Sequence, residues 1–127
     1  MELDCNGTKI DKLPDSLLRL RKLNCDNTLI KRIPETYKSL RYLICPNTPI
    51  DMLPDSLTSL IKLNCSETQI SILPKNLDKL YYLNISETKI NKLPNNLQSL
   101  QFLYCDKSCK LCRLFGNLLI FVSEIFK

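Results

Sequence analysis

Residues 23–40 read LNCDNTLIKRIPETYKSL, and a closely related stretch, LNCSETQISILPKNLDKL, occupies residues 63–80. The two stretches match because one pattern returns along the chain with a 20-residue period. Leucine occupies the same column in six successive repeats, at Leu3, Leu23, Leu43, Leu63, Leu83 and Leu103. Proline marks a second column, at Pro14, Pro34, Pro54, Pro74 and Pro94. Columns that keep this period along most of the chain predict a repeat protein built from stacked units.

Each repeat begins with a short alternating segment, for example Lys22-Leu23-Asn24-Cys25-Asp26. Alternation with period two is typical of a strand that is buried on one face, so Leu23 and Cys25 are expected to point into the core. Stacking of the repeats would place these strands side by side in a parallel sheet. Thr28 follows where the chain must turn, and its hydroxyl is expected to bond neighbouring backbone groups. The proline then predicts an extended or 3₁₀ return across the core.

The repeat unit, L-x-x-L-x-C-x-x-T-x-I-x-x-L-P-x-x-L, resembles a leucine-rich repeat of the short, 20-residue class. The resemblance covers residues 3 to about 108. It implies an α/β-type repeat solenoid with a parallel sheet on the concave face and extended or 3₁₀ segments on the convex face. The sequence departs from the usual pattern by carrying Thr or Ser where Asn is common, and mostly Cys at the third apolar strand position.

Short repeats of this kind resemble those of secreted bacterial effectors and of large DNA viruses. That resemblance implies a protein partner, which would be a host protein if the chain is viral or an effector, and a location in the cytoplasm of the host. Residues 1–4, Met-Glu-Leu-Asp, have neither the basic nor the apolar region of a secretory signal peptide. We therefore also expect a reducing compartment and cysteines that remain thiols.

The C-terminal residues 109–127 leave the 20-residue period. Their apolar residues recur at helical spacing, at Leu111, Leu114, Phe115, Leu118, Leu119, Val122, Ile125 and Phe126. This spacing predicts an amphipathic helix that caps a solenoid of residues 1–108. A helix that docks on a partner or a membrane surface is the alternative. The uninterrupted apolar run at residues 118–122 is far shorter than the roughly 20 residues of a membrane span.

Composition excludes most catalytic chemistry. The chain of 127 residues has no histidine, which removes imidazole bases and Ser/His/Asp triads. Its two glycines are too few for a phosphate-binding loop or a dinucleotide fingerprint. The net charge of +5 is spread along the sequence, whereas nucleic-acid binders usually concentrate it on one face. We therefore expect a protein that is not an enzyme, uses no cofactor and does not bind nucleic acid.

The cysteines form a column of their own, at Cys5, Cys25, Cys45, Cys65 and Cys105, in which Ile85 takes the fifth place. Free cysteine is among the most buried residue types, so this column is expected to be a ladder of buried thiols. Cys105, Cys109 and Cys112 have the spacing C-x₃-C-x₂-C, and zinc is the alternative for these three. No metal site is predicted, because a fourth ligand is not evident and isoleucine fits the column.

The outward positions of the predicted strands carry the candidate binding residues. Two apolar spots are expected on this exposed face, and their members are Tyr42, Ile44, Tyr82, Phe102 and Tyr104. Exposed aromatic clusters with polar surroundings are typical of protein-binding surfaces. Rings that are covered by the C-terminal segment or merely scattered are the alternative. A different function, self-association as a homodimer through the uncapped N-terminal edge strand, is the second hypothesis.

Overall fold

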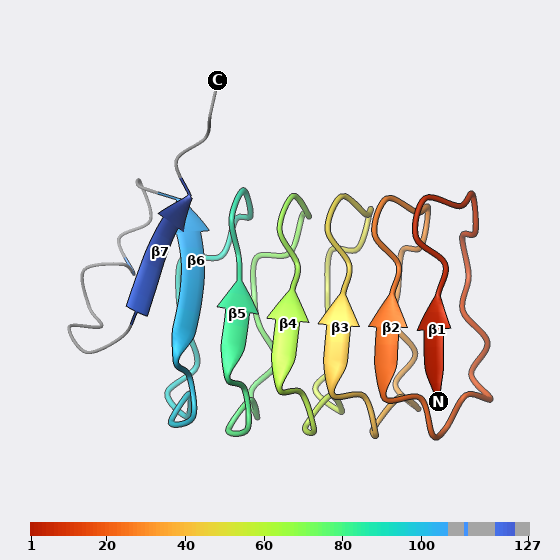
Figure 1. Ribbon diagram of the computed structural model, residues 1–127, viewed down its shortest axis with the longest axis horizontal. Coiled ribbons are helices and arrows are strands. Elements are labelled where there is room, and N and C mark those ends of the chain that lie inside the picture. Colours follow the sequence, from red (N-terminus) through yellow and green to blue (C-terminus); the bar gives the residue numbers. More distant parts are fainter. Residues whose placement is uncertain (107–110, 112–118, 124–127) are drawn as a thin grey trace.

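The computed structural model describes residues 1–106, 111 and 119–123, and its strands form one parallel sheet in sequential order (Figure 1). The strands are β1 (Glu2–Asp4), β2 (Lys22–Asn24), β3 (Tyr42–Ile44), β4 (Lys62–Asn64), β5 (Tyr82–Asn84), β6 (Phe102–Asp106) and β7 (Leu119–Ser123). The strands of neighbouring repeats pair in register, so that Leu23 lies beside Leu43 and Leu43 beside Leu63. The predicted stack of repeats with a parallel sheet is therefore confirmed.

The buried columns of the repeats form one continuous core. Leu23, Leu43, Leu63 and Leu83 on the inner face of the sheet have no exposed surface. The apolar residues of the turn and return segments, such as Ile30 and Leu40, are equally buried and complete this core. Since each three-residue strand buries at most one side chain, the hydrophobic stabilisation of each repeat comes mainly from its neighbours above and below.

The turn after each of the first five strands is closed by a threonine hydroxyl. Thr28, Thr48 and Thr68 are buried, and their Oγ1 atoms donate to the carbonyl oxygens three residues earlier at 2.8, 2.8 and 2.7 Å. The predicted role of this column is therefore confirmed. Each bond stays within its own repeat, which satisfies a backbone carbonyl that would otherwise be buried without a partner.

The return segment of each repeat is extended backbone with tight turns, without a helix among the repeats of residues 1–106. In the second repeat Tyr37 takes the place that leucine has in the others, and its ring is fully buried. Its hydroxyl donates to the carbonyl oxygen of Pro14 at 2.7 Å, which ties the first two repeats together. Burial is also the main reason why the pKa of Tyr37 is raised to about 12.

The C-terminal helix expected over residues 109–127 is not observed, and this expectation is wrong for Leu119–Ser123. These residues form β7, which pairs in parallel with β6 and places Leu119 beside Phe102. The segment LIFVS contains Ile, Val and Phe, which favour strands, and pairing covers the edge of β6. Of the remaining residues, the structure describes only Leu111, which is buried in a 3₁₀ turn.

The rest of residues 109–127 lies outside the described part of the chain, and the division at residue 108 stays a prediction. Within the described residues, no helix is long or apolar enough to cross a membrane.

Candidate functional site

The outer face of the sheet is lined by two rows of side chains, which flank the buried leucine of each strand. Strand register places Tyr42, Lys62, Tyr82 and Phe102 side by side in the first row. The same pairing places Ile44, Asn64, Asn84 and Tyr104 in the second row. These residues are exposed or half-buried, while the leucine between the two rows is buried in every strand. The alternation predicted from the sequence therefore positions this surface.

Three of the predicted binding residues come together over β5 and β6. Tyr82 lies beside Phe102 in the sheet, and the rings of Tyr82 and Tyr104 are 5.1 Å apart between centroids, with an interplanar angle of 40°. Phe102 also meets Tyr81, edge to face, at a centroid distance of 5.1 Å. Aromatic pairs at such distances stabilise one another beyond the effect of burial. The four rings therefore form one cluster, which we call the aromatic platform.

Tyr81 is the member of the platform that the sequence did not predict. It precedes β5 by one residue and is 46 % exposed. Its backbone N–H donates to the carbonyl oxygen of Ile61, which fixes the chain at the point where β5 begins. The adjacent pair Tyr81-Tyr82 is the signal in the sequence that could have identified it.

Lys62 places a positive charge beside the platform. Its Nζ atom lies 4.6 Å from the centroid of the Tyr82 ring, a cation–π arrangement. The pKa of Tyr82 is raised, mainly by burial and further by the neighbouring Tyr104, while a hydrogen bond from Asn84 lowers it. The Tyr82 hydroxyl therefore stays neutral at physiological pH, and the positive charge of Lys62 rests on an uncharged ring.

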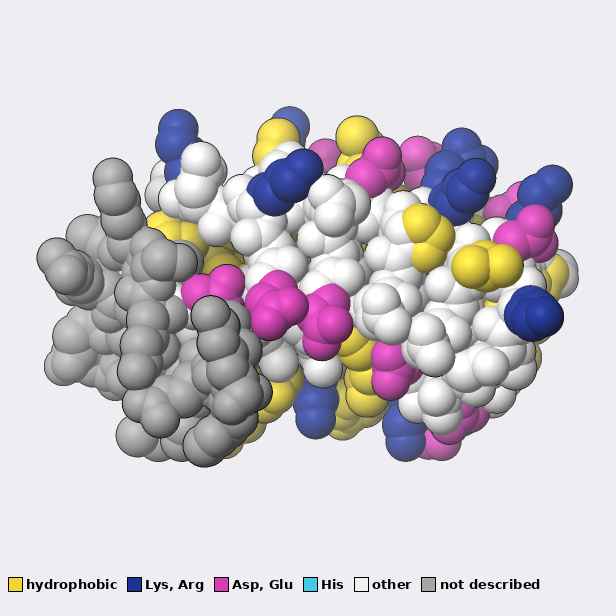
Figure 2. All heavy atoms as spheres, turned by 90° about the horizontal axis from the view of Figure 1, so that it is seen from above, with side chains coloured by type: hydrophobic (Ala, Val, Ile, Leu, Met, Phe, Trp, Pro, Cys, Tyr) yellow, Lys and Arg dark blue, Asp and Glu magenta, His cyan; other side chains and the backbone are white. Residues whose placement is uncertain are grey.

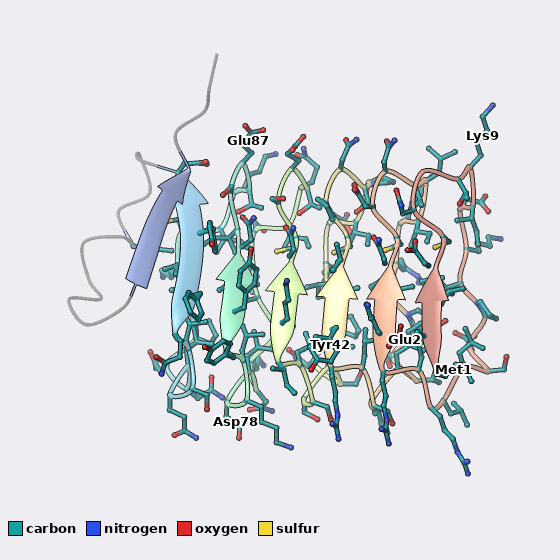
Figure 3. The ribbon with its side chains drawn as sticks, in the orientation of Figure 1. Met1, Glu2, Lys9, Tyr42, Asp78 and Glu87 are labelled. Atoms are coloured by element: carbon teal, nitrogen blue, oxygen red, sulfur yellow. The ribbon has the colours of Figure 1, made fainter. Side chains whose placement is uncertain are left out.

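The other two predicted residues form a separate spot on β3. Tyr42 is 39 % exposed and Ile44 is half-buried. Strand β4 lies between this spot and the platform, and Figure 3 shows Tyr42 near the amino end of β3. The structure thus brings Tyr82, Phe102 and Tyr104 together but holds Tyr42 and Ile44 one strand away from them.

The asparagines of the second row are held by the backbone that follows them. The Oδ1 atom of Asn64 accepts hydrogen bonds from the backbone N–H and the hydroxyl of Ser66, at 3.1 and 2.8 Å. Asn84 Oδ1 accepts from the backbone N–H of Ser86 at 3.0 Å. Since the oxygen of the Asn64 amide is used in this way, its Nδ2 group is left as a donor on the outer face.

Acidic side chains occupy the turns at the carboxyl ends of the later strands (Figure 2). Glu67 and Glu87 both have φ values of 54°, in the left-handed region where earlier repeats have Gly7, Asn27 and Asn47. The backbone N–H of Glu87 donates to a carboxylate oxygen of Asp106 at 2.9 Å. Figure 3 shows Glu87 beyond the tip of β5, at the end of the molecule opposite to Asp78.

The cysteine column is a ladder of buried thiols over its first four members. Cys25, Cys45 and Cys65 are buried and Cys5 is half-buried, and all four are free. Burial raises the pKa of Cys25 and of Cys65 to about 12, and that of Cys45 far above its usual value. Neutral, buried thiols of this kind are poor nucleophiles.

Cys105 differs from the other members of the column, because it is disulfide-bonded. The expectation that the cysteines all remain thiols is therefore wrong at this position. Cys109 and Cys112 lie outside the described residues. Among the residues that are described, no group of three or more cysteines, aspartates or glutamates is placed to hold a metal ion.

Several solved structures are similar to this chain. The functional domain of InlJ from Listeria monocytogenes, which includes a cysteine ladder, matches with a TM-score of 0.82 and 27 % identity over 97 % of this chain and 29 % of that one. The leucine-rich-repeat protein LIC12759 of Leptospira interrogans matches with a TM-score of 0.74 and 22 % identity, over 97 % of this chain and 37 % of that one.

An internalin of Listeria monocytogenes, InlF, matches with a TM-score of 0.59 and 21 % identity, over 98 % of this chain and 49 % of that one. The chain thus spans less than half of the length of these three proteins. None of the three is viral, so a viral source and a host partner stay predictions. No protein-family model matches the sequence, and no curated protein gives a significant match.

The regular repeat period, the in-register parallel strands and the structural neighbours agree with one another. Such solenoids serve in general as protein–protein interaction modules, and the exposed sheet is their usual binding surface. The chain therefore has a leucine-rich-repeat fold, a solenoid of parallel strands that recur every 20 residues.

Proposed function

We propose that this chain is a non-enzymatic interaction module that binds a protein partner through the outer face of its sheet. The binding residues would be the aromatic platform, which contains the predicted Tyr82, Phe102 and Tyr104, together with the predicted spot of Tyr42 and Ile44. The observation that carries the proposal is the packing of Tyr82 against Tyr104 and of Tyr81 against Phe102 on a face that, over β1–β6, is polar apart from Tyr42 and Ile44.

Ring-on-ring contacts favour binding because they fix the side chains before a partner arrives. A partner then loses little conformational entropy of the rings when it covers them. Aromatic residues are also enriched among the few residues that supply most of the binding free energy at interfaces. The platform offers both properties, since its rings are already packed and still partly exposed.

The test is a capture experiment with two matched variants. The first, Tyr82→Ser with Tyr104→Ser, removes two rings of the platform. The second, Met52→Ser with Ile72→Ser, removes exposed apolar surface elsewhere, since these two side chains are 72 % and 77 % exposed. Both variants should first show wild-type circular dichroism and unfolding midpoints.

A protein retained by the wild type and by the Met52/Ile72 variant, but lost with the Tyr82/Tyr104 variant, is the expected result. Loss with the Met52/Ile72 variant alone would move the interface away from the sheet. Light scattering of the purified chain addresses the second hypothesis, because self-association predicts a dimer that forms with rising concentration even in the Tyr82/Tyr104 variant.

A further inference from the structure

The strand between the two apolar spots, β4, presents a different chemistry from its neighbours. Its outward side chains are Lys62 and Asn64, and both are half-buried. The Asn64 amide turns its oxygen toward Ser66, so that both residues offer hydrogen-bond donors to the outer face. Within the described residues, no carboxylate lies within ion-pair distance of Lys62, whereas the equivalent Lys22 pairs with Glu2 at 3.7 Å.

Lys62 and Asn64 together form what we call the donor strip. Aromatic side chains, which we call its apolar walls, flank this strip on both sides. Tyr82 lies beside Lys62 on the platform side, and Tyr42 lies beside it on the side of β3. A carboxylate placed between such walls loses part of its hydration, and the remaining charge–donor contacts then become stronger than they would be in water. The arrangement therefore suits an anionic group that is carried between two apolar ones.

The charges around the strip orient such a ligand. Arg41 precedes β3 at the amino ends of the strands, next to the first row, which contains Lys62. At the carboxyl ends, Glu67 and Glu87 are exposed on the turns and repel an approaching carboxylate (Figure 2). Around β4 these residues place positive charge, from Lys62 and Arg41, near the amino ends of the strands and negative charge, from Glu67 and Glu87, at the carboxyl-end turns, which favours an acidic group beside Lys62.

The spacing of the walls limits the shape of the ligand. Tyr42 and Tyr82 are separated by two strand spacings, or roughly 9.4–9.8 Å in a regular sheet. A polyproline-II segment returns to the same side every three residues, about 9.3 Å along its axis. An extended chain that crosses the strands can therefore place apolar side chains i and i+3 on the two walls.

We propose that β4 is the anchor point for an acidic, extended polypeptide segment. A carboxylate of the segment binds Lys62 Nζ and Asn64 Nδ2, while apolar residues three positions apart contact Tyr42 with Ile44 on one side and Tyr82 on the other. This proposal rests on the proposed function and deepens it by naming the chemistry of the partner.

Two peptides test the proposal directly. The probe is acetyl-Pro-Leu-Pro-Glu-Leu-Pro-amide, and its control carries Gln in place of Glu. Binding to the ¹⁵N-labelled chain is followed by NMR, which reports on the side-chain amide of Asn64. We expect the Glu peptide to bind at least about tenfold more tightly than the Gln peptide, to shift the Asn64 amide signal, and to weaken as salt is added.

Two lysine variants complete the design. Lys62→Met keeps the aliphatic stem but removes the charge, and it should abolish the preference for the Glu peptide. Lys22→Met changes the equivalent lysine of β2, which already has a carboxylate partner, and it should leave the preference intact. A preference for Glu that survives in Lys62→Met would overturn the proposal.

Other outcomes separate this proposal from the function on which it rests. Equal binding of both peptides, lost in the Tyr82/Tyr104 variant, would overturn the carboxylate anchor and leave the aromatic surface standing. Binding of neither peptide at millimolar concentration would also overturn the anchor. The capture experiment with the platform variants would then decide the proposed function on its own.

Discussion

The inner and outer faces of the sheet are made by the same strands, yet the inner face accepts few residue types and the outer face accepts many. On the inner face, Leu23, Leu43, Leu63 and Leu83 recur without change and have no exposed surface. On the outer face, the equivalent positions Lys22, Tyr42, Lys62 and Tyr82 alternate between lysine and tyrosine, so adjacent strands differ there in charge and aromaticity.

Packing explains the difference between the faces. An inner side chain must fill a space shaped by the repeats on either side, because protein interiors are packed as densely as organic crystals. An outer side chain meets solvent and only its cross-strand neighbours. Repetition therefore marks the residues that hold the solenoid together, and its absence marks the residues that are free to recognise a partner.

The largest effect is expected from a cavity in the inner face. Leu63→Ala removes buried methyl groups between two repeats and should lower the free energy of unfolding by roughly 2–5 kcal/mol. Lys22→Ala, on the outer face, should change it by less than about 0.5 kcal/mol. Urea titrations measure both. Similar losses in the two variants would remove the distinction between the faces.

A smaller loss of stability is expected when the buried threonine hydroxyl of a turn is removed. Thr68→Val keeps the shape of the side chain but removes the hydroxyl that donates to the carbonyl oxygen of Cys65 at 2.7 Å. Leaving this carbonyl without the bond should cost about 1–3 kcal/mol. Thr58→Val, at an exposed position, serves as the control. An unchanged urea midpoint for Thr68→Val would show that the hydroxyl bond contributes nothing net to stability.

The thiols of the inner face predict an alkaline loss of stability. In the native state the pKa values of Cys25 and Cys65 are about 12, whereas a thiol in the unfolded chain ionises near 9. Between these values the unfolded state binds fewer protons, so each thiol lowers the unfolding free energy by about 1.4 kcal/mol per pH unit as the pH rises.

The control for this pH dependence is the double variant Cys25→Val with Cys65→Val. Valine fills a similar space, so stability near pH 7 should change by less than about 1.5 kcal/mol per site. Its unfolding free energy, measured by urea titration from pH 8 to 10.5, should fall less steeply than that of the wild type. Parallel curves would mean that the buried thiols are not the groups that titrate.

The smallest effect on stability is expected at Glu67, in the turn after β4, which belongs to neither face of the sheet. Glu67 has a φ value of 54°, a conformation that asparagine tolerates better than glutamate. Glu67→Asn should therefore stabilise the chain by roughly 0.5–1 kcal/mol. Glu67→Ala removes the same charge without the backbone advantage. If thermal denaturation shows equal gains for both variants, the cause is charge and not backbone conformation.

The repeat period predicted the sheet and its register because burial repeats with it. The C-terminal segment could not be predicted in this way. The spacing of Leu119, Val122 and Phe126 satisfies a helix, while the run from Leu119 to Val122 is equally compatible with a buried strand. The choice between helix and strand depends on the edge of β6, with which the segment pairs. That edge exists only once the repeats have assembled.

The candidate site was predictable to the extent that strand alternation determines it. Alternation placed Tyr82, Phe102 and Tyr104 on adjacent strands, and their proximity is observed. It could not include Tyr81, which lies just outside its strand, or predict that Lys62 lies over the Tyr82 ring. The position of a long, flexible side chain depends on its neighbours in space, which one repeat alone does not specify.

The threonine bonds have a consequence for how such a chain can change its length. The hydroxyl of Thr48 closes its turn on Cys45, within a single repeat. Backbone bonds such as that from Cys45 N–H to the Asn64 carbonyl oxygen, by contrast, join one repeat to the next through positions that every repeat supplies. A duplication or deletion of one whole repeat between equivalent positions therefore leaves no turn open and no strand mispaired. Solenoids of this type can grow or shrink by whole repeats, and each added unit brings one new set of outward side chains on which selection can act.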